Sequence, residues 1–245
     1  MKGLSELLPT LIMAGVAMAL LAIAYFYAMQ STWALSSSSR LEYARDALLA
    51  IAQNLDSVIQ GGNYEISYPS RALAFGYEVV GALTIYVNGS AALSVPCASI
   101  YAQVPGQLVA EGVVYGSRTT IVNDTRLLAE VLARQEGGRA VVALDACRVQ
   151  ASVEVTKDRR GSFFYFNLLV VNLTPVLAGG AGGYIRLEPA GAPAIYTYAG
   201  VLNLTIVATG PAGARALGPM DIYPSYSGGP ITVTVKVVNV RAVIA

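Results

Sequence analysis

A chain of 245 residues can form one large domain or two small ones, and its formal net charge of +1 provides no long-range field to attract nucleic acid. Its 55% apolar and only 13% charged residues indicate an apolar segment joined to tightly packed strands, which is unusual for a soluble enzyme. Because the chain has no histidine, it lacks the usual general base near neutral pH and the commonest metal ligand. We therefore expect no enzymatic activity, no cofactor, no metal site and no nucleic-acid partner.

The first part of the chain predicts a long uncharged helix. No charged residue occurs between Leu7 and Ser39. Its most apolar stretch, 7–29, would extend roughly 35 Å as a helix, and a hydrocarbon core is about 30 Å thick. Aromatic side chains gather at positions 25–27, at the end of this stretch, where amphipathic rings favour lipid headgroups. The segment 7–29 is therefore predicted to span a membrane.

The continuation of this helix is predicted to be amphipathic. Over residues 40–60, apolar side chains recur every three or four positions, which places them on one face of a helix. These positions are Leu41, Ala44, Leu48, Ile51, Leu55 and Val58. Such a face packs on the chain's own globular domain or on neighbouring copies. Gly61 and Gly62 favour the end of a helix, so we expect one helix over 4–60.

From residue 63 to residue 245 the periodicity becomes that of strands. Runs of Val, Ile, Thr, Tyr and Phe are separated by Gly, Pro and Asn-Gly, which is typical of an antiparallel β domain. Asn88-Gly89 predicts a tight hairpin turn, and Lys157–Gly161 predicts the charged tip of a second hairpin. Alternating apolar residues over Ile231–Val237 predict a half-buried strand near the C-terminus.

Two segments interrupt the strand pattern. Asp124–Gln135 has apolar residues at helix-compatible spacing, so we expect a short helix there. Ala178–Gly183 is too rich in glycine for a strand and lacks the Lys-Ser/Thr of a phosphate-binding loop, so we expect a flexible loop. The predicted fold class is α+β, with a long N-terminal helix, transmembrane and then amphipathic, followed by an antiparallel β-sandwich-like domain over 63–245. One sandwich is favoured, although periodicity does not decide between one and two β subdomains.

The two cysteines and the asparagine motifs indicate whether the protein lies inside or outside the cell. Cys97 and Cys147 are too few and too far apart for a zinc knuckle, which leaves a disulfide, in an oxidising location, or two buried thiols. Four of the eight asparagines begin an Asn-X-Ser/Thr glycosylation motif. These are Asn88, Asn123, Asn172 and Asn203. This excess predicts an external location; the third motif is the weakest because a proline follows it.

The N-terminal text, Lys2-Gly3-Leu4-Ser5 followed by Thr10-Leu11-Ile12 and the apolar run, resembles the class III signal peptide and helix of archaeal type IV pilins and archaellins. The resemblance implies a leader over 1–3 that a prepilin peptidase cuts between Gly3 and Leu4. It also implies a filament subunit that lies in the cell membrane before assembly, meets membrane lipid there, and polymerises with itself at the cell surface through pilus assembly machinery. The filament-core positions would be Leu7, Leu11, Met13, Val16, Leu20, Ile23 and Tyr27. The chain departs from the family in its three-residue leader with one lysine, and it has Leu8 where many bacterial pilins carry glutamate.

Two alternatives remain at this level. The helix could be an uncleaved anchor that holds a monomeric surface-binding or archaellum-stator-like protein. It could also be a secretory signal cut after Ala34, although its apolar run is longer than the usual core of such a signal.

Overall fold

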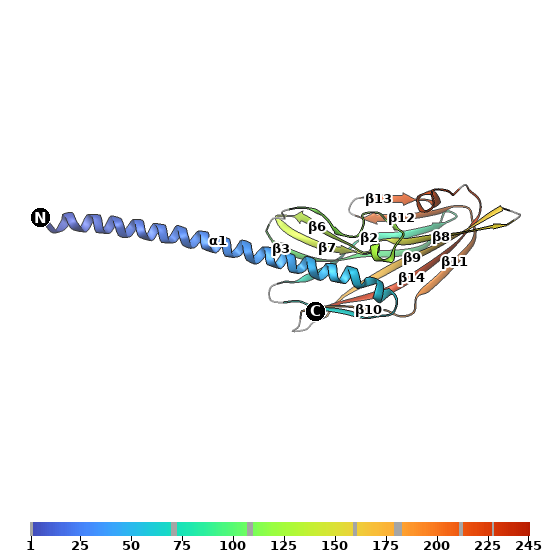
Figure 1. Cartoon of the computed structure of the whole chain (residues 1–245), viewed down its shortest axis with the longest axis horizontal. Helices are drawn as coiled ribbons and strands as arrows, with labels where there is room; N and C mark the ends of the chain where they lie inside the picture. The colour runs from blue at the N-terminus through green and yellow to red at the C-terminus, as the bar shows by residue number, and fades with distance from the viewer. Residues whose placement is uncertain are drawn as a thin grey trace.

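The computed structural model of this chain describes residues 2–69, 73–106, 110–158, 161–178, 183–210, 213–226 and 228–245. Within these ranges, the side chains of 2–12, 14, 30–36, 158, 210 and 213–214 lie outside the description. The molecule consists of one long helix, α1 (Lys2–Ile59), and a β domain (Figure 1). Two short helical turns, η1 (Thr125–Leu127) and α2 (Pro219–Ile222), complete the helical part.

The described strands form two seven-stranded sheets. The first has the order β1 (Tyr64–Ser67), β10 (Tyr184–Pro189), β14 (Ile231–Ile244), β9 (Gly161–Leu177), β8 (Val149–Asp158) and β5 (Ile121–Val122), with β11 (Ala194–Val201) also paired to β14. The second has the order β13 (Gly213–Leu217), β12 (Leu204–Gly210), β2 (Phe75–Val87), β3 (Ser90–Pro105), β7 (Arg139–Asp145), β6 (Glu130–Glu136) and β4 (Gly112–Tyr115).

The predicted fold class is wrong, because the chain is mostly strand in two curled sheets and the sheets are not purely antiparallel. The central strands β9 and β14 run parallel along fourteen register pairs, from Phe164 opposite Ile231 to Leu177 opposite Ile244. β5 and β8 also pair in parallel. The C-terminal strand is predicted from its alternating apolar residues. This alternation has the same period in parallel and antiparallel sheets, so it does not predict the direction in which neighbouring strands run.

The predicted membrane span over 7–29 is also corrected. In the part of the chain that the structure describes, no helix combines the length and the apolarity needed to cross a bilayer.

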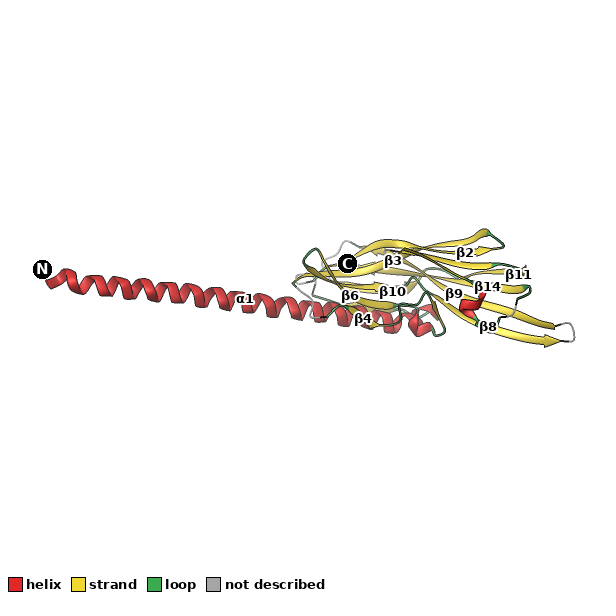
Figure 2. Cartoon of the chain, turned by 90° about the horizontal axis from the view of Figure 1, so that it is seen from above, coloured by secondary structure: helices red, strands yellow, loops and turns green. Residues whose placement is uncertain are grey.

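The C-terminal half of α1 is packed between the two sheets, while its N-terminal half projects beyond the β domain (Figures 1 and 2). The predicted apolar stripe is confirmed: Leu48, Ile51 and Val58 are fully buried in one cluster with side chains of both sheets. The helix ends at Ile59, and Gly61 follows with φ +103°, a conformation that glycine adopts without steric cost.

Two apolar clusters make up the core. The first surrounds the packed half of α1, and in the second the sheets contact each other directly. Along β14 the buried positions change from odd to even numbers between Val237 and Val238, and along β9 the change falls between Val170 and Val171, their register partners. Because successive side chains point to opposite faces of a strand, the two clusters lie on opposite faces of these strands. β3, β9 and β14 contribute to both clusters, so the described strands form one unit.

The predicted local elements have mixed outcomes. The turn between β2 and β3 is confirmed, with left-handed backbone at Asn88 (φ 52°) and Gly89 (φ 81°). The antiparallel hairpin of β8 and β9 is confirmed too, and residues 159–160 of its tip lie outside the description. The helix expected over 124–135 is wrong: only the turn η1 forms, and β6 then pairs with β4 and β7. Of the glycine-rich loop, residues 179–182 lie outside the description.

Candidate assembly interface

The projecting part of α1 carries an uncovered apolar surface. We call residues 13–29 of α1 the stem. Every described side chain in it is exposed, including ten large apolar ones that are between 46% and 74% exposed. They are Met13, Val16, Met18, Leu20, Leu21, Ile23, Tyr25, Phe26, Tyr27 and Met29. Full burial of one such side chain contributes about 1.5–3 kcal/mol, so the stem has a driving force for association on the order of 10 kcal/mol before entropic costs.

The stem has no polar face among its described residues. With about 100° of rotation per residue, Val16, Leu20, Ile23 and Tyr27 follow one face of the helix. Met18, Tyr25 and Met29 follow the opposite face, and alanines occupy much of the surface between. A helix that is apolar all round is buried in its functional state. One partner helix would cover one side only, so the stem needs neighbours on several sides.

The filament-core positions predicted from the sequence lie on α1. Met13, Val16, Leu20, Ile23 and Tyr27 all lie exposed on the stem. Leu7 and Leu11 are in the backbone of α1, but their side chains lie outside the description, as do those of Gly3 and Leu4 in the first turn.

A cleft lies where α1 enters the β domain, and we call it the basal cleft. It has a volume of about 710 Å³. One wall is α1 from Ser37 to Arg45, and the others come from the ends of β3, β4, β6 and β7. Apolar side chains provide most of its lining: Leu41, Val104, Val113, Val114, Ala133, Ala140 and Val142. No local pattern predicts this cleft, because its walls come from segments up to about a hundred residues apart.

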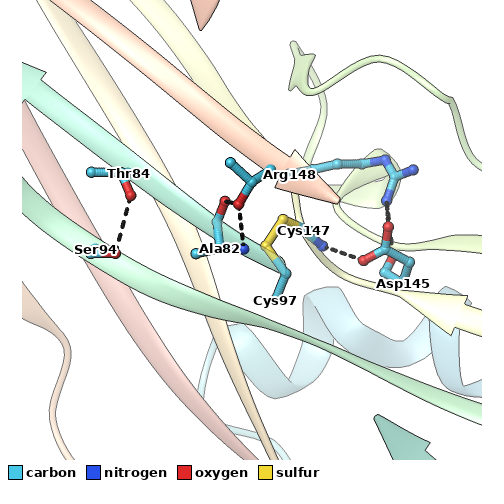
Figure 3. Close-up of a disulfide and its surroundings, with 8 residues drawn as sticks. Ala82, Thr84, Ser94, Cys97, Asp145, Cys147 and Arg148 are labelled. Carbon is cyan, nitrogen blue, oxygen red and sulfur yellow. Dashed lines mark hydrogen bonds and ion pairs between the residues drawn. A yellow bond between two sulfur atoms is a disulfide. The ribbon is translucent and has the colours of Figure 1, made fainter. Parts of the chain in front are cut away.

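A disulfide and a buried ion pair stabilise the middle of the β domain. Figure 3 shows the disulfide with Arg148 and Asp145 beside it. Cys97 of β3 is bonded to Cys147, with Cα atoms 5.0 Å apart, so the disulfide rather than the pair of buried thiols is what the structure contains. Next to it, the Arg148 guanidinium donates from Nε to the Ser117 carbonyl (2.6 Å) and from Nη2 to the Glu130 carboxylate. Arg148 and Glu130 are both almost fully buried, which makes this an internal ion pair.

Burial changes the acid–base properties of this cluster. It lowers the pKa of Arg148 to about 10, because the charged guanidinium loses hydration. It raises the pKa of Asp145, and the hydrogen bond that the Asp145 carboxylate accepts from the Cys147 N–H (2.9 Å) opposes this shift only in part. Arg148 remains charged near neutral pH and joins the 116–120 segment to β6 and β7. We find a structural role for these residues, because their hydrogen bonds are made to one another and to the backbone.

The four glycosylation motifs lie in different surroundings. Asn88 and Asn203 are exposed and adjacent: the Asn88 Oδ1 accepts hydrogen bonds from the backbone N–H of Leu202 (2.8 Å) and of Asn203 (3.2 Å). Asn123 is also exposed. Asn172 is only half-exposed within β9, and its Nδ2 donates to Asn239 Oδ1 (2.8 Å). Its amide nitrogen, the atom that a glycan would modify, is therefore engaged.

Comparison with protein-family models, curated proteins and solved structures finds no match to this chain.

Proposed function

We propose that this protein is a structural subunit of an extracellular, type IV pilus-like filament and has no enzymatic role. The observation that carries the proposal is the stem, whose exposed apolar side chains surround the helix. In a filament, the stems of many copies pack together and remove this surface from water on all sides, while the β domains form the outer layer. The principal partner is then a second copy of the same chain.

Two further observations support a location outside the cell. Disulfides persist in oxidising environments, and Cys97 and Cys147 are joined by one. Three glycosylation motifs, at Asn88, Asn123 and Asn203, have exposed asparagines. Prepilin peptidase and pilus assembly machinery follow only from the resemblance of the N-terminal sequence, and remain part of the proposal.

The test is a charge placed in the stem, with a matched charge elsewhere. Leu21 of the stem and Leu202 between β11 and β12 are similarly exposed, at 69% and 74%. Leu21→Asp would place an unpaired carboxylate among packed stems, so we expect loss of filaments from sheared surface material in electron microscopy. Leu202→Asp should leave filaments unchanged. Normal filaments from Leu21→Asp, or a wild-type chain found only as monomers at the cell surface, would contradict the proposal and favour the monomeric surface protein.

A further inference from the structure

The basal cleft and the stem are complementary in chemistry. The helix α1 forms the stem and also one wall of the cleft. The lining of the cleft is apolar at its floor, where Val104 and Val142 are buried, and polar at its rim, where Glu42, Arg45 and Glu111 lie. An occupant with apolar rings and polar tips fits such a site, because the rings cover the floor and the tips reach the charged rim.

The stem carries side chains of this kind. We call Tyr25, Phe26 and Tyr27 the aromatic collar; these rings are between 61% and 70% exposed. Each is large, and two of the three end in a hydroxyl that needs a hydrogen-bond partner once it is removed from water. No other run of three consecutive exposed aromatic residues occurs among the described side chains.

The collar of a chain does not reach that chain's own cleft. α1 is one uninterrupted helix from Lys2 to Ile59, so Phe26 stays about 22 Å along the axis from Leu41 in the cleft, at 1.5 Å per residue. The occupant must therefore be another molecule. A second copy that lies parallel to the first and is displaced by about 22 Å along the helix axis brings its collar level with this cleft.

We propose that the basal cleft of each subunit holds the Tyr27 ring from the aromatic collar of a second copy of the chain. Consecutive rings on a helix point about 100° apart, so one cleft takes one face of the collar, and Tyr27 lies on the face that Leu20 and Ile23 extend. This inference rests on the proposed function, since it assumes that stems associate. The contact joins two different surfaces, collar and cleft, so each added subunit still presents one unused collar and one unused cleft. Heterologous contacts with an axial displacement do not close into a dimer and generate an open helical polymer. The pairing therefore explains growth into a filament and sets the direction of the subunits.

Paired cysteines test this contact in assembled filaments. Val113 lies on the β4 wall of the cleft and is 40% exposed. In the double variant Tyr27→Cys/Val113→Cys, oxidation of filaments should give a ladder of covalent multimers on a non-reducing gel. A bond within one chain is not expected, because Tyr27 lies about 21 Å along α1 from Leu41, which lines the same cleft as Val113, and a disulfide needs Cα atoms within about 7 Å. The control pair Tyr27→Cys/Leu202→Cys should give no ladder.

A second measurement uses the single variant Val113→Cys and leaves the collar intact. The native cysteines are bonded to each other, so the new thiol is the one that a maleimide labels. We expect labelling to fall at least tenfold when subunits assemble, while Leu202→Cys stays reactive. Filaments that give neither a ladder nor protection of Val113→Cys would overturn this inference and leave the proposed function standing. A wild-type chain that forms no filaments at all would overturn both.

Discussion

The two halves of α1 have the same secondary structure and opposite surfaces. In the packed half, 41–59, apolar residues form one stripe, and charged residues such as Arg45 and Asp46 remain exposed. In the stem, apolar side chains face every direction and none of those described is buried. The first half of the helix therefore needs several partners outside the chain, whereas the second has its partners within it. The β domain folds around one part of the helix and leaves the other part for association.

A charge placed in the packed half of α1 should have the strongest effect. Leu48 is fully buried between the sheets, so Leu48→Asp should cost more than about 4 kcal/mol and prevent the β domain from folding, since an unpaired carboxylate would lie in the apolar core. Leu20→Asp in the stem should leave the thermal unfolding midpoint of isolated subunits unchanged and abolish assembly. Circular dichroism and sedimentation measure the two effects. A cooperative unfolding transition for Leu48→Asp at the wild-type temperature would disprove that the packed half of α1 is needed for folding.

A second prediction concerns the buried ion pair. Arg148→Met leaves the buried Glu130 carboxylate with only the exposed Arg118 guanidinium, whose Nε is 3.9 Å from Glu130 Oε1, and we expect a loss of about 3 kcal/mol in the free energy of unfolding. The double variant Arg148→Met/Glu130→Leu should recover much of that loss, because the uncompensated charge is removed. Urea denaturation of isolated subunits gives both values. If the single and double variants lose the same free energy of unfolding, the uncompensated charge of Glu130 is not the cause of the loss.

The disulfide should affect the β domain and not the stem. It closes a loop with a sequence separation of 50, so Cys97→Ala/Cys147→Ala should lower the free energy of unfolding by up to about 4 kcal/mol. The variant should melt at a lower temperature than the wild type. Below that temperature it should still assemble, since the stem is unchanged. Loss of filaments from a variant that is folded by circular dichroism would contradict this separation.

A smaller effect depends on pH. The pKa of Asp145 is higher in the folded chain than its ordinary value near 3.8, so between these two values the folded state binds more protons than the unfolded state. This carboxyl therefore makes stability fall as pH rises through the window that begins near 3.8. Asp145→Asn should remove that contribution, which is seen by comparing urea midpoints of the variant and the wild type from pH 3.5 to pH 7. Parallel midpoint curves would show that Asp145 does not contribute.

The smallest expected structural effect is at the glycosylation motifs. We expect glycans on the exposed Asn88, Asn123 and Asn203 and none on Asn172, whose amide is bonded to Asn239. Peptide mass spectrometry of native material checks each site, and Asn203→Gln should lose one glycan without a change in folding. A glycan on Asn172 would contradict the pairing seen between β9 and β14.

Short-range patterns in the sequence predicted the local elements well, because their causes are local. The three-four spacing of Leu48, Ile51 and Leu55 is enough to define a helix face, and Asn88-Gly89 is enough to define a hairpin turn. The helix predicted over 124–135 does not form. The apolar spacing there also suits a strand, and β6 pairs with β4 and β7 instead. No local pattern marks long-range partners such as Glu130 with Arg148, the parallel register of β9 and β14, or the walls of the basal cleft.

The parallel ladder of β9 and β14 has a mechanical consequence. The packed half of α1 contacts β14, and the Tyr68 hydroxyl, just after β1, donates to the carbonyl of Ala245, just after β14 (2.6 Å). A pull along the stem is therefore passed to a strand held by fourteen register pairs on one side and by β10 and β11 on the other. Drawn along its own axis, that strand must break these bonds together rather than one at a time, so we expect the β domain to resist stretching well beyond what its thermal stability alone would suggest.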